Sequence, residues 1–454
     1  MSSISEFVED TKSQAVDELS DLLRIPSVST VSAHDSDCRH AAEWIEQYLK
    51  RLNFSRTELK ADENHPVVWG VGPNAPGKPT VLVYGHYDVQ PPDPLSLWES
   101  DPFTPTVRDG KLYARGVSDD KGQVVAVLKG FEAAVRNGEV PVNLRVLIEG
   151  QEESGGEVLF GLLEREPELT EADVVVVSDM AYYLPGYPAV YTGLRGICYA
   201  EITVRTAKAD LHSGAYGGVA PNAHEALLRI LAKLKAPSGR IRIPGLYDLV
   251  ERPSKQILNG WKSLPFSETK FRKHEVRSRA LTGLSRYTVL ERLWALPTFE
   301  IHGISGGFTG EGAKTVIPSE AMAKVSLRLV PRQTASKVLL LLKKAVRELA
   351  PSYADVDIRS IHSGDPVLVN TDAPVFESLS RAFVEVEGRA PVLIRSGGSI
   401  PIVPELRKRG ATMILTGIGL PDDGLHAPNE KLNLDQFYKG MEVFGRFFEL
   451  LGEA

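Results

Sequence analysis

Apolar positions along this chain follow two periods, one typical of helices and one typical of strands. They recur at helical spacing over residues 4–24 and about 36–52. Strand and helix patterns then alternate, with strands expected at 80–84, 143–149 and 173–178 and helices at 123–136 and 157–164. The unbroken valines at 174–177 are typical of strands buried on both faces. This order predicts an α/β fold with a mixed, mostly parallel sheet flanked by helices.

The pattern changes near residue 193 and changes back after Pro374. Between these points, strands are expected at 197–206, 297–303, 319–330 and 354–361, and helices at 221–235 and 333–349. The order β-α-β-β-α-β is that of a ferredoxin-like α+β unit. If residues on both sides of this unit share one site, residues 1–193 and 366–454 form a discontinuous catalytic domain. Residues 194–365 are then an inserted lid or dimerisation domain.

One long stretch of the inserted unit follows neither period. Residues 240–295 are basic and irregular in pattern. A solvated excursion or a subunit contact is favoured there over an anion site. The role of residues 268–292 stays open at this point.

The composition is that of a globular protein, with 43% hydrophobic and 24% charged residues, and a length of 454 residues favours two or three domains. A net charge of −7 disfavours nucleic acid as a partner. The longest aliphatic block, residues 338–342, is far shorter than the roughly 20 residues that span a bilayer. No signal-like leader is visible, and two cysteines, Cys38 and Cys198, are too few for a thiolate cluster. We therefore expect a cytoplasmic protein that is not associated with a membrane.

Side chains that can bind metals follow strand-like runs at five places along the chain. They are His86, the pair Asp119 and Asp120, the pair Glu152 and Glu153, Asp179, and His426. In open α/β sheets, ligands bind beyond the carboxyl ends of the strands. Two histidines and several carboxylates that meet there would make a mixed nitrogen and oxygen site for two divalent metals. The sequence therefore predicts a metal-dependent hydrolase.

Each of these residues also has a simpler structural explanation. A histidine after a strand is more often structural, although Asp88 is placed to accept the proton of the second ring nitrogen of His86. Of the aspartates at 119–120, one could bridge two cations, and one could cap the helix expected from Gln123. In extended backbone, the glutamates at 152–153 would point opposite ways, so that one could bind metal and the other act as general base. Taken alone, such a pair is usually a solvated turn.

Several short motifs, in order along the chain, resemble those of the co-catalytic metallopeptidase family of carnosinases, aminoacylases and glutamate carboxypeptidases. They lie at 86–88 (His-Tyr-Asp), 114–122, 149–155 and 210–214 (Asp-Leu-His-Ser-Gly). Further motifs, at 191–199, 312–318, 326–331, 397–401 and 422–426, are similar to the branch of cytosolic nonspecific dipeptidases and carnosinases. The resemblance runs from about residue 20 to the C-terminus. It departs at Gln151, where many relatives carry a third acidic residue.

The resemblance implies two divalent metal ions per subunit, either zinc or manganese. Asp119 matches the ligand that bridges them. His86 and Asp179 would complete one metal site, and Glu153 and His426 would complete the other.

The resemblance also implies which residues handle protons and substrate. Glu152 matches the general base, and Asp88 matches the residue that orients the metal-binding histidine. Substrate or the developing oxyanion would be held by His212, Thr315, Arg328, His362 and Ser399. The protein is expected to be a homodimer in which His212 acts across the interface, and the peptide bond at 119–120 is expected to be cis.

Together these features predict a dipeptidase. Water activated between the two metals, with Glu152 as general base, would attack the peptide bond of dipeptides or short peptides with a free C-terminal carboxylate. Arg328 or another donor of the lid would bind that carboxylate. Two alternatives stay open. One is an N-acyl amino acid deacylase with the same metal chemistry, and the other is a non-catalytic binding protein on a hydrolase scaffold.

Overall fold

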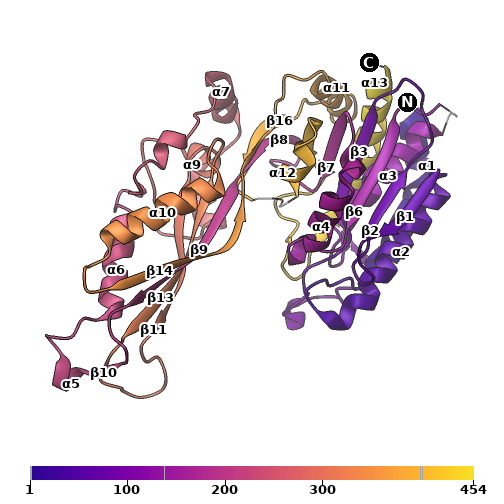
Figure 1. The fold of residues 1–454 in the computed structure, drawn as a ribbon. Coiled ribbons are helices and arrows are strands. Elements are labelled where there is room, and N and C mark those ends of the chain that lie inside the picture. Colours follow the sequence, from indigo (N-terminus) through magenta and orange to yellow (C-terminus); the bar gives the residue numbers. More distant parts are fainter. Residues whose placement is uncertain (1–2, 137–138, 399, 401, 454) are drawn as a thin grey trace. The chain divides into compact units, whose positions relative to one another are not determined.

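The computed structural model describes residues 3–136, 139–398, 400 and 402–453. The chain forms two compact units, each with its own central sheet (Figure 1). The first unit holds the chain up to Thr192, Val369–Ile394 and the chain from Ile400 onward. The second holds Gly193–Leu368 and the short segment that begins at Arg395. The first unit is therefore discontinuous in sequence, and the second is inserted into it.

A six-stranded sheet lies at the centre of the first unit, in the order β1-β2-β6-β3-β7-β17. Its strands are β1 (Arg56–Lys60), β2 (Val67–Val71), β3 (Thr80–His86), β6 (Asn143–Glu149), β7 (Val174–Ser178) and β17 (Thr412–Thr416). β6, β3, β7 and β17 run parallel, and β2 and β1 extend the sheet by antiparallel pairs. β7 is buried at every position between β3 and β17, which explains its unbroken valines. The predicted mixed, mostly parallel sheet is confirmed.

Helices flank this sheet (Figure 1). They are α1 (Ser3–Leu23), α2 (Asp35–Arg51), α3 (Lys121–Val135), α4 (Glu157–Arg165), α11 (Val375–Glu387), α12 (Val403–Arg407) and α13 (Leu434–Glu453). α2 packs against β1 and β2, whereas α3 packs against β3 and is covered by α1 and α13. Because α3 has neighbours on both sides, nearly all of its residues are buried.

A four-stranded antiparallel sheet, in the order β11-β13-β9-β14, forms the second unit. Its strands are β9 (Gly196–Arg205), β11 (Thr298–Gly306), β13 (Glu320–Leu329) and β14 (Asp355–Gly364), and its long helices are α6 (Ala223–Leu234) and α10 (Ala335–Leu349). Both helices pack on one face, where Cys198, Ala200, Ile202 and Val204 are buried at every second position of β9. The ferredoxin-like order predicted from the sequence is confirmed.

Shorter strands complete both units. β4 (Thr106–Arg108), β5 (Lys111–Tyr113) and β18 (Lys431–Asn433) form a small sheet in the first unit. β8 (Ala189–Leu194), β15 (Val367–Leu368) and β16 (Val392–Ser396) form another, where the chain passes from one unit to the other. In the second unit, β10 (Leu211–His212) pairs with β12 (Val316–Ile317) and leads into α5 (Ser213–Tyr216).

The basic stretch at 240–295, expected to be irregular, contains short helices. These are α7 (Lys255–Ser263), α8 (Glu268–Lys270) and α9 (Val289–Trp294). Each begins after a side-chain cap, from Ser254, Ser267 and Thr288. The pattern of apolar residues did not predict these helices, because each helix has too few turns to show a repeating apolar face. Within the described part of the chain, none of the helices has the length and hydropathy needed to cross a membrane.

Two glycines allow α3 and α13 to approach closely. A Cβ at Gly130 would lie 2.7 Å from the backbone nitrogen of Gly445 and 2.8 Å from the carbonyl oxygen of Met441. Gly130→Ala should therefore lower the free energy of unfolding by about 1–3 kcal/mol through overpacking, even though alanine is the better helix former. Urea denaturation measures this change.

Gly161→Ala in α4 is the matched control. The nearest atom to a Cβ there would be the flexible end of Arg165, at 3.4 Å. This variant should be neutral or slightly stabilising, because only the helix propensity changes. Equal destabilisation by both variants would contradict the close helix packing.

Candidate metal centre

The candidate metal ligands meet at the carboxyl ends of the parallel strands of the first unit. His86 is the last residue of β3, Asp179 follows β7 directly, and Asp119 comes just before α3. Glu153 lies in the turn after β6, and His426 lies in the loop after β17. Because parallel strands end at the same edge of a sheet, residues far apart in sequence arrive side by side.

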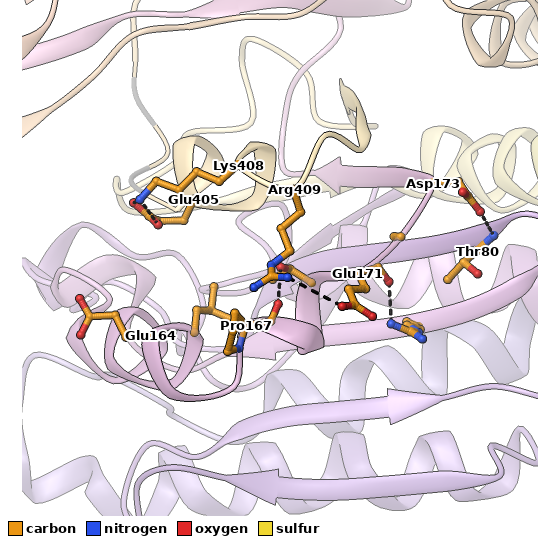
Figure 2. Close-up of a pocket in the computed structure, with 12 residues that line it drawn as sticks. Thr80, Glu164, Pro167, Glu171, Asp173, Glu405, Lys408 and Arg409 are labelled. Atoms are coloured by element: carbon orange, nitrogen blue, oxygen red, sulfur yellow. Dashed lines mark hydrogen bonds and ion pairs between the residues drawn. The ribbon is translucent and has the colours of Figure 1, made fainter.

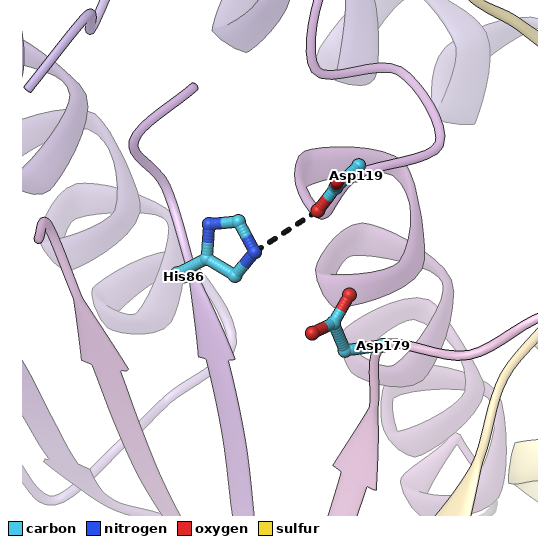
Figure 3. Close-up of side chains that lie close together, drawn as sticks. All are labelled: His86, Asp119 and Asp179. Atoms are coloured by element: carbon cyan, nitrogen blue, oxygen red, sulfur yellow. Dashed lines mark hydrogen bonds and ion pairs between the residues drawn. The ribbon is translucent and has the colours of Figure 1, made fainter. Parts of the chain in front are cut away.

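Five side chains form two groups that share Asp119. One group is His86, Asp119 and Asp179 (Figure 3), and the other is Asp119, Glu153 and His426. Within each group, the candidate ligand atoms all lie within 4.8 Å of one another. The Nε2 atom of His86 lies 3.1 Å from one oxygen of Asp119, and the Nε2 atom of His426 lies 3.0 Å from the other. Each oxygen of this carboxylate therefore faces a different group.

Asp88 positions the ring of His86 by contacting Nδ1, the ring nitrogen that does not contact Asp119. This Nδ1 atom lies 3.0 Å from the backbone oxygen of Asp88 and 3.4 Å from the nearer carboxylate oxygen. A proton on Nδ1 bonds to this carbonyl, so that Nε2, on the far side of the ring, could offer its lone pair to a cation held with Asp119. Asp88 is the residue that the sequence predicts to accept this proton, and its backbone carbonyl is nearer to Nδ1 than its carboxylate is.

The carboxylate of Asp88 instead organises the turn that carries the two glutamates. It accepts hydrogen bonds from the backbone nitrogens of Glu152 (3.2 Å) and Glu153 (3.1 Å), and from the hydroxyl of Ser29 (2.6 Å). Glu152–Ser154 is a 3-10 turn, so the alternative of a turn holds at this point and that of extended backbone is wrong. The glutamates nonetheless differ in surroundings, since Gln90 donates to Glu153 (2.8 Å).

Burial shifts the acid-base behaviour of the site. Burial, together with the neighbouring charges of Glu153, Asp88 and Asp119, raises the pKa of Glu152 to about 7, although the charge of His86 opposes this shift. A carboxyl group with such a pKa can both accept and release a proton near neutral pH. Burial also raises the pKa of Asp179 well above its usual range.

The candidate ligand atoms of the two groups suit divalent cations. Hydrogen bonds from His426 and His86 outweigh burial and hold the pKa of Asp119 below its usual range. Hydrogen bonds to Asp119 and Glu153 raise the pKa of His426 to about 10. Among the described residues, these histidines are the only basic groups within 4.0 Å of the Asp119 and Glu153 carboxylates. Buried carboxylates without Lys or Arg partners, mixed with imidazoles, are the ligands that zinc and manganese accept.

A carboxylate that sequence reasoning missed holds the Asp119 loop. Glu430 accepts hydrogen bonds from the backbone nitrogens of Ser118 (2.9 Å), Asp119 (3.2 Å) and Gly116 (3.0 Å), and from the guanidinium of Arg115 (2.6 Å). Glu430 follows His426 closely in sequence. It therefore ties the loop of one candidate ligand to the segment that carries another.

The aspartates at 119–120 behave differently from each other. The peptide bond between them is cis, as expected. Asp120 occupies the position before α3, but its side chain makes no capping hydrogen bond. It accepts a hydrogen bond from the backbone nitrogen of His86 instead (3.1 Å). The helix begins at Lys121 rather than near Gln123, and the capping alternative is wrong.

Four of the five expected substrate-binding residues belong to the second unit as the structure describes it. His212 is exposed, and its Nδ1 atom accepts a hydrogen bond from the backbone of Gly214. Ser213 donates to the backbone oxygen of Thr315 (3.1 Å), so these two loops lie together. Arg328 and His362 lie on β13 and β14, beside β9. Ser399 lies outside the described residues.

A cavity of about 810 Å³ lies at the opposite ends of the strands, near Thr80 and Asp173 (Figure 2). Several of its charged groups have partners within the protein. Asp173 accepts from the backbone nitrogen of Thr80 (2.7 Å), and Arg409 lies 3.7 Å from Glu171. The residues with candidate chemistry are therefore those at the carboxyl ends.

Comparisons with known proteins place the chain among peptidases. A model of peptidase family M20/M25/M40 matches residues 82–450. Cys-Gly metallodipeptidase dug1 of Schizosaccharomyces pombe is 33% identical over 97% of this chain and 96% of its own length. Beta-Ala-His dipeptidase of Homo sapiens is 34% identical over 84% of this chain and 77% of its own length.

Two solved structures share the fold of the whole chain. The crystal structure of human carnosine dipeptidase 1 has a TM-score of 0.82 and 29% identity, and covers 99% of this chain and 98% of its own. The M20 family metallo-carboxypeptidase Sso-CP2 from Sulfolobus solfataricus has a TM-score of 0.86 and 29% identity, and covers 97% of this chain and 99% of its own.

Removal of the Glu430 carboxylate should destabilise the first unit. Glu430→Gln would leave Arg115, which is buried, without its acidic partner. Breaking a buried ion pair by removing one partner costs about 3–5 kcal/mol, and urea denaturation measures the loss. Glu405→Gln, which breaks the surface pair with Lys408, is the control and should cost less than about 1 kcal/mol. Similar losses of stability in both variants would show that the buried pair of Glu430 and Arg115 contributes no more than a surface ion pair.

Proposed function

This chain belongs to peptidase family M20/M25/M40, and we propose that it hydrolyses dipeptides or short peptides with a free C-terminal carboxylate. The supporting observation is the pair of candidate ligand groups that share Asp119, with Glu152 beside them. Relatives named Cys-Gly metallodipeptidase and Beta-Ala-His dipeptidase match most of the chain. The resemblance to the dipeptidase and carnosinase branch is confirmed, and neither the deacylase nor the non-catalytic alternative is favoured.

We assign two divalent metal ions, zinc or manganese, to the shared site. His86, Asp119 and Asp179 would hold one ion, and Asp119, Glu153 and His426 would hold the other. Such ions polarise a scissile carbonyl and lower the pKa of water. Asp119 suits the bridging role because its two oxygens face different histidines.

Glu152 is assigned the proton transfers. Its carboxylate would take a proton from the attacking water and later deliver it to the leaving amine. The turn that carries it is fixed by the carboxylate of Asp88, which keeps the base in one position. A pKa of about 7 suits a group that must be deprotonated before the attack and protonated after it.

The second unit is assigned to substrate. Arg328 would bind the C-terminal carboxylate, because a guanidinium forms two parallel hydrogen bonds with such a group. Thr315, His362 and Ser399 would complete substrate binding. His212 would act on the partner subunit's substrate in a homodimer, which its exposure in the second unit allows. Cys38 and Cys198 are buried free thiols, in keeping with the cytoplasmic location that we propose.

The function is tested by assaying the protein, loaded with zinc or manganese, against Cys-Gly, β-Ala-His and N-acetylalanine. Hydrolysis of dipeptides in preference to N-acetylalanine is expected. Glu152→Gln should lower turnover by about 10²–10⁴-fold, since it removes the base but keeps the shape of the side chain. Preferred cleavage of N-acetylalanine would favour a deacylase, and metal binding without any cleavage would favour a binding protein.

Metal content separates the roles of the two acidic residues. Glu152→Gln should keep both metals, as measured by elemental analysis. Asp119→Ala should lose affinity for both, because one carboxylate serves both groups. Retention of one metal at full strength would contradict the bridging role.

Action of His212 across subunits is tested with mixed dimers. In the proposed arrangement, a dimer of His212→Ala with Glu152→Gln contains one site with both defects and one site with neither. Each single variant should be impaired, with His212→Ala losing about 10²–10³-fold in turnover, as expected for one donor to the oxyanion. The hybrid should regain up to half of wild-type activity. If hybrids form and no activity returns, His212 does not act across the interface.

A further inference from the structure

A cavity of about 260 Å³ opens in the basic stretch at residues 240–295, which belongs to the second unit. This stretch holds twelve arginines and lysines but only five acidic residues, although the whole chain has a net charge of −7. Three of the arginines, Arg240, Arg252 and Arg286, line the cavity together with Tyr247 and Tyr287. The rest of its wall is aliphatic, apart from one glutamate. The cavity therefore combines positive charge with an apolar surface.

Each of these arginines packs on the ring of a tyrosine. The guanidinium carbon of Arg240 lies 4.5 Å from the ring centre of Tyr247. The guanidinium carbons of Arg286 and Arg252 lie 4.8 Å and 5.7 Å from the ring centre of Tyr287. Arg252 also donates a hydrogen bond to the hydroxyl of Tyr287 (2.9 Å). These contacts position the side chains around the cavity without neutralising their charge.

Among the residues that the structure describes, none of the three arginines has an acidic partner within 4.0 Å. Glu291 is the glutamate of the cavity wall. One of its oxygens accepts a hydrogen bond from the backbone nitrogen of Thr288 (2.8 Å), as part of the capping box of α9. Because guanidinium groups stay charged at neutral pH, the wall carries three positive charges against one negative charge. A bound anion would compensate this excess.

Two glycines allow the loops that carry Arg240 and Arg286 to meet. Gly239 directly precedes Arg240, and Gly283 lies shortly before Arg286. A Cβ at Gly239 would lie 2.5 Å from the Cα of Gly283, closer than a side chain can approach. Both glycines also have a positive φ, 83° and 99°, which other residues rarely adopt. The backbone of the two loops is therefore in direct contact, which brings both arginines to one cavity.

We infer that this cavity binds a small organic phosphate, with the phosphate on the arginines and a compact apolar body against the tyrosines and the aliphatic wall. A guanidinium offers parallel N–H donors that match two oxygens of a phosphate. A phosphate monoester is nearly a dianion at neutral pH, so it compensates the excess positive charge, whereas a carboxylate compensates half of it. Small-molecule sites usually occupy about 300–1,000 Å³, so this cavity suits a body as small as one ring. The site does not depend on the proposed hydrolysis.

The site is tested by isothermal titration of the metal-loaded protein with phenyl phosphate, which joins one ring to a phosphate. Arg286→Gln should weaken binding by about 10–100-fold, as expected for the loss of a charged hydrogen bond. Arg389→Gln is the matched control. Arg389 is also exposed and packs on a tyrosine, Tyr187 (3.9 Å), but it does not line the cavity, so this variant should bind as wild type does. Equal affinities in all three proteins would overturn the site.

Binding in the cavity is distinguished from binding to metal ions, which also attract phosphate oxygens. Asp119→Ala is expected to lose metals but keeps the cavity, so it should bind phenyl phosphate with the affinity that Arg286→Gln lacks. Affinity that is lost in Asp119→Ala and unchanged in Arg286→Gln would place the ligand on the metals and overturn the proposal. Absence of dipeptide hydrolysis would count against the proposed function and leave these affinities unchanged.

Phenol and phenylacetate test which part of the ligand is recognised. Both should bind wild type more weakly than phenyl phosphate, because phenol has no anionic group and phenylacetate has one negative charge. Equal affinity for either compound would overturn the assignment to a phosphate. The oligomeric state of Arg286→Gln, measured by size-exclusion chromatography with light scattering, should match that of wild type. A changed state with unchanged affinity for phenyl phosphate would identify a subunit contact in place of a ligand site.

Discussion

The carboxylate of Asp119 lies between two imidazoles, and much of the first unit serves to keep it there. His86 approaches from the end of β3, and His426 approaches from the loop after β17. Behind the carboxylate, Glu430 binds the backbone on the N-terminal side of Asp119. On the C-terminal side, Asp120 accepts from the backbone of His86. The position of Asp119 between the two imidazoles is therefore fixed by partners on both sides of one peptide bond.

This arrangement explains how several carboxylates can be held together at one edge of the sheet. Burial of several carboxylates is unfavourable unless hydrogen bonds or cations compensate it. Asp88 and Glu430 are compensated by backbone and side-chain donors. Asp119, Glu153 and Asp179 have no Lys or Arg partner among the described residues, so the two histidines compensate Asp119 and Glu153, and bound cations would add to this compensation. Asp88 and Glu430 therefore hold the backbone around the site, whereas Asp119, Glu153 and Asp179 are available to bind ligands.

Sequence patterns predicted the parts of this site that depend on strand ends, and missed those that depend on long-range pairing. Strands such as β3 and β7 are apolar runs followed by a polar residue, so their side chains could be placed at one edge of the sheet. Glu430 gave no local signal, because its partner Gly116 is 314 residues away in sequence. The sequence predicted a contact between Asp88 and His86, but it gave no sign that the Asp88 carboxylate also binds Ser29 and the glutamate turn. That turn was the simpler of the two explanations for the glutamate pair, and Gly155 ends it with a φ of 115°.

The insertion of the second unit sets an order in which the site can be assembled during synthesis. His86, Asp119 and Asp179 all precede Thr192, so one candidate ligand group is complete when the first part of the chain has left the ribosome. His426 and Glu430 follow only after the whole second unit has been made. Until then, the Asp119 loop lacks the carboxylate that holds it, and the second ligand group lacks its histidine. A nascent chain of this protein therefore carries only one of the two candidate ligand groups for the time needed to translate the inserted unit.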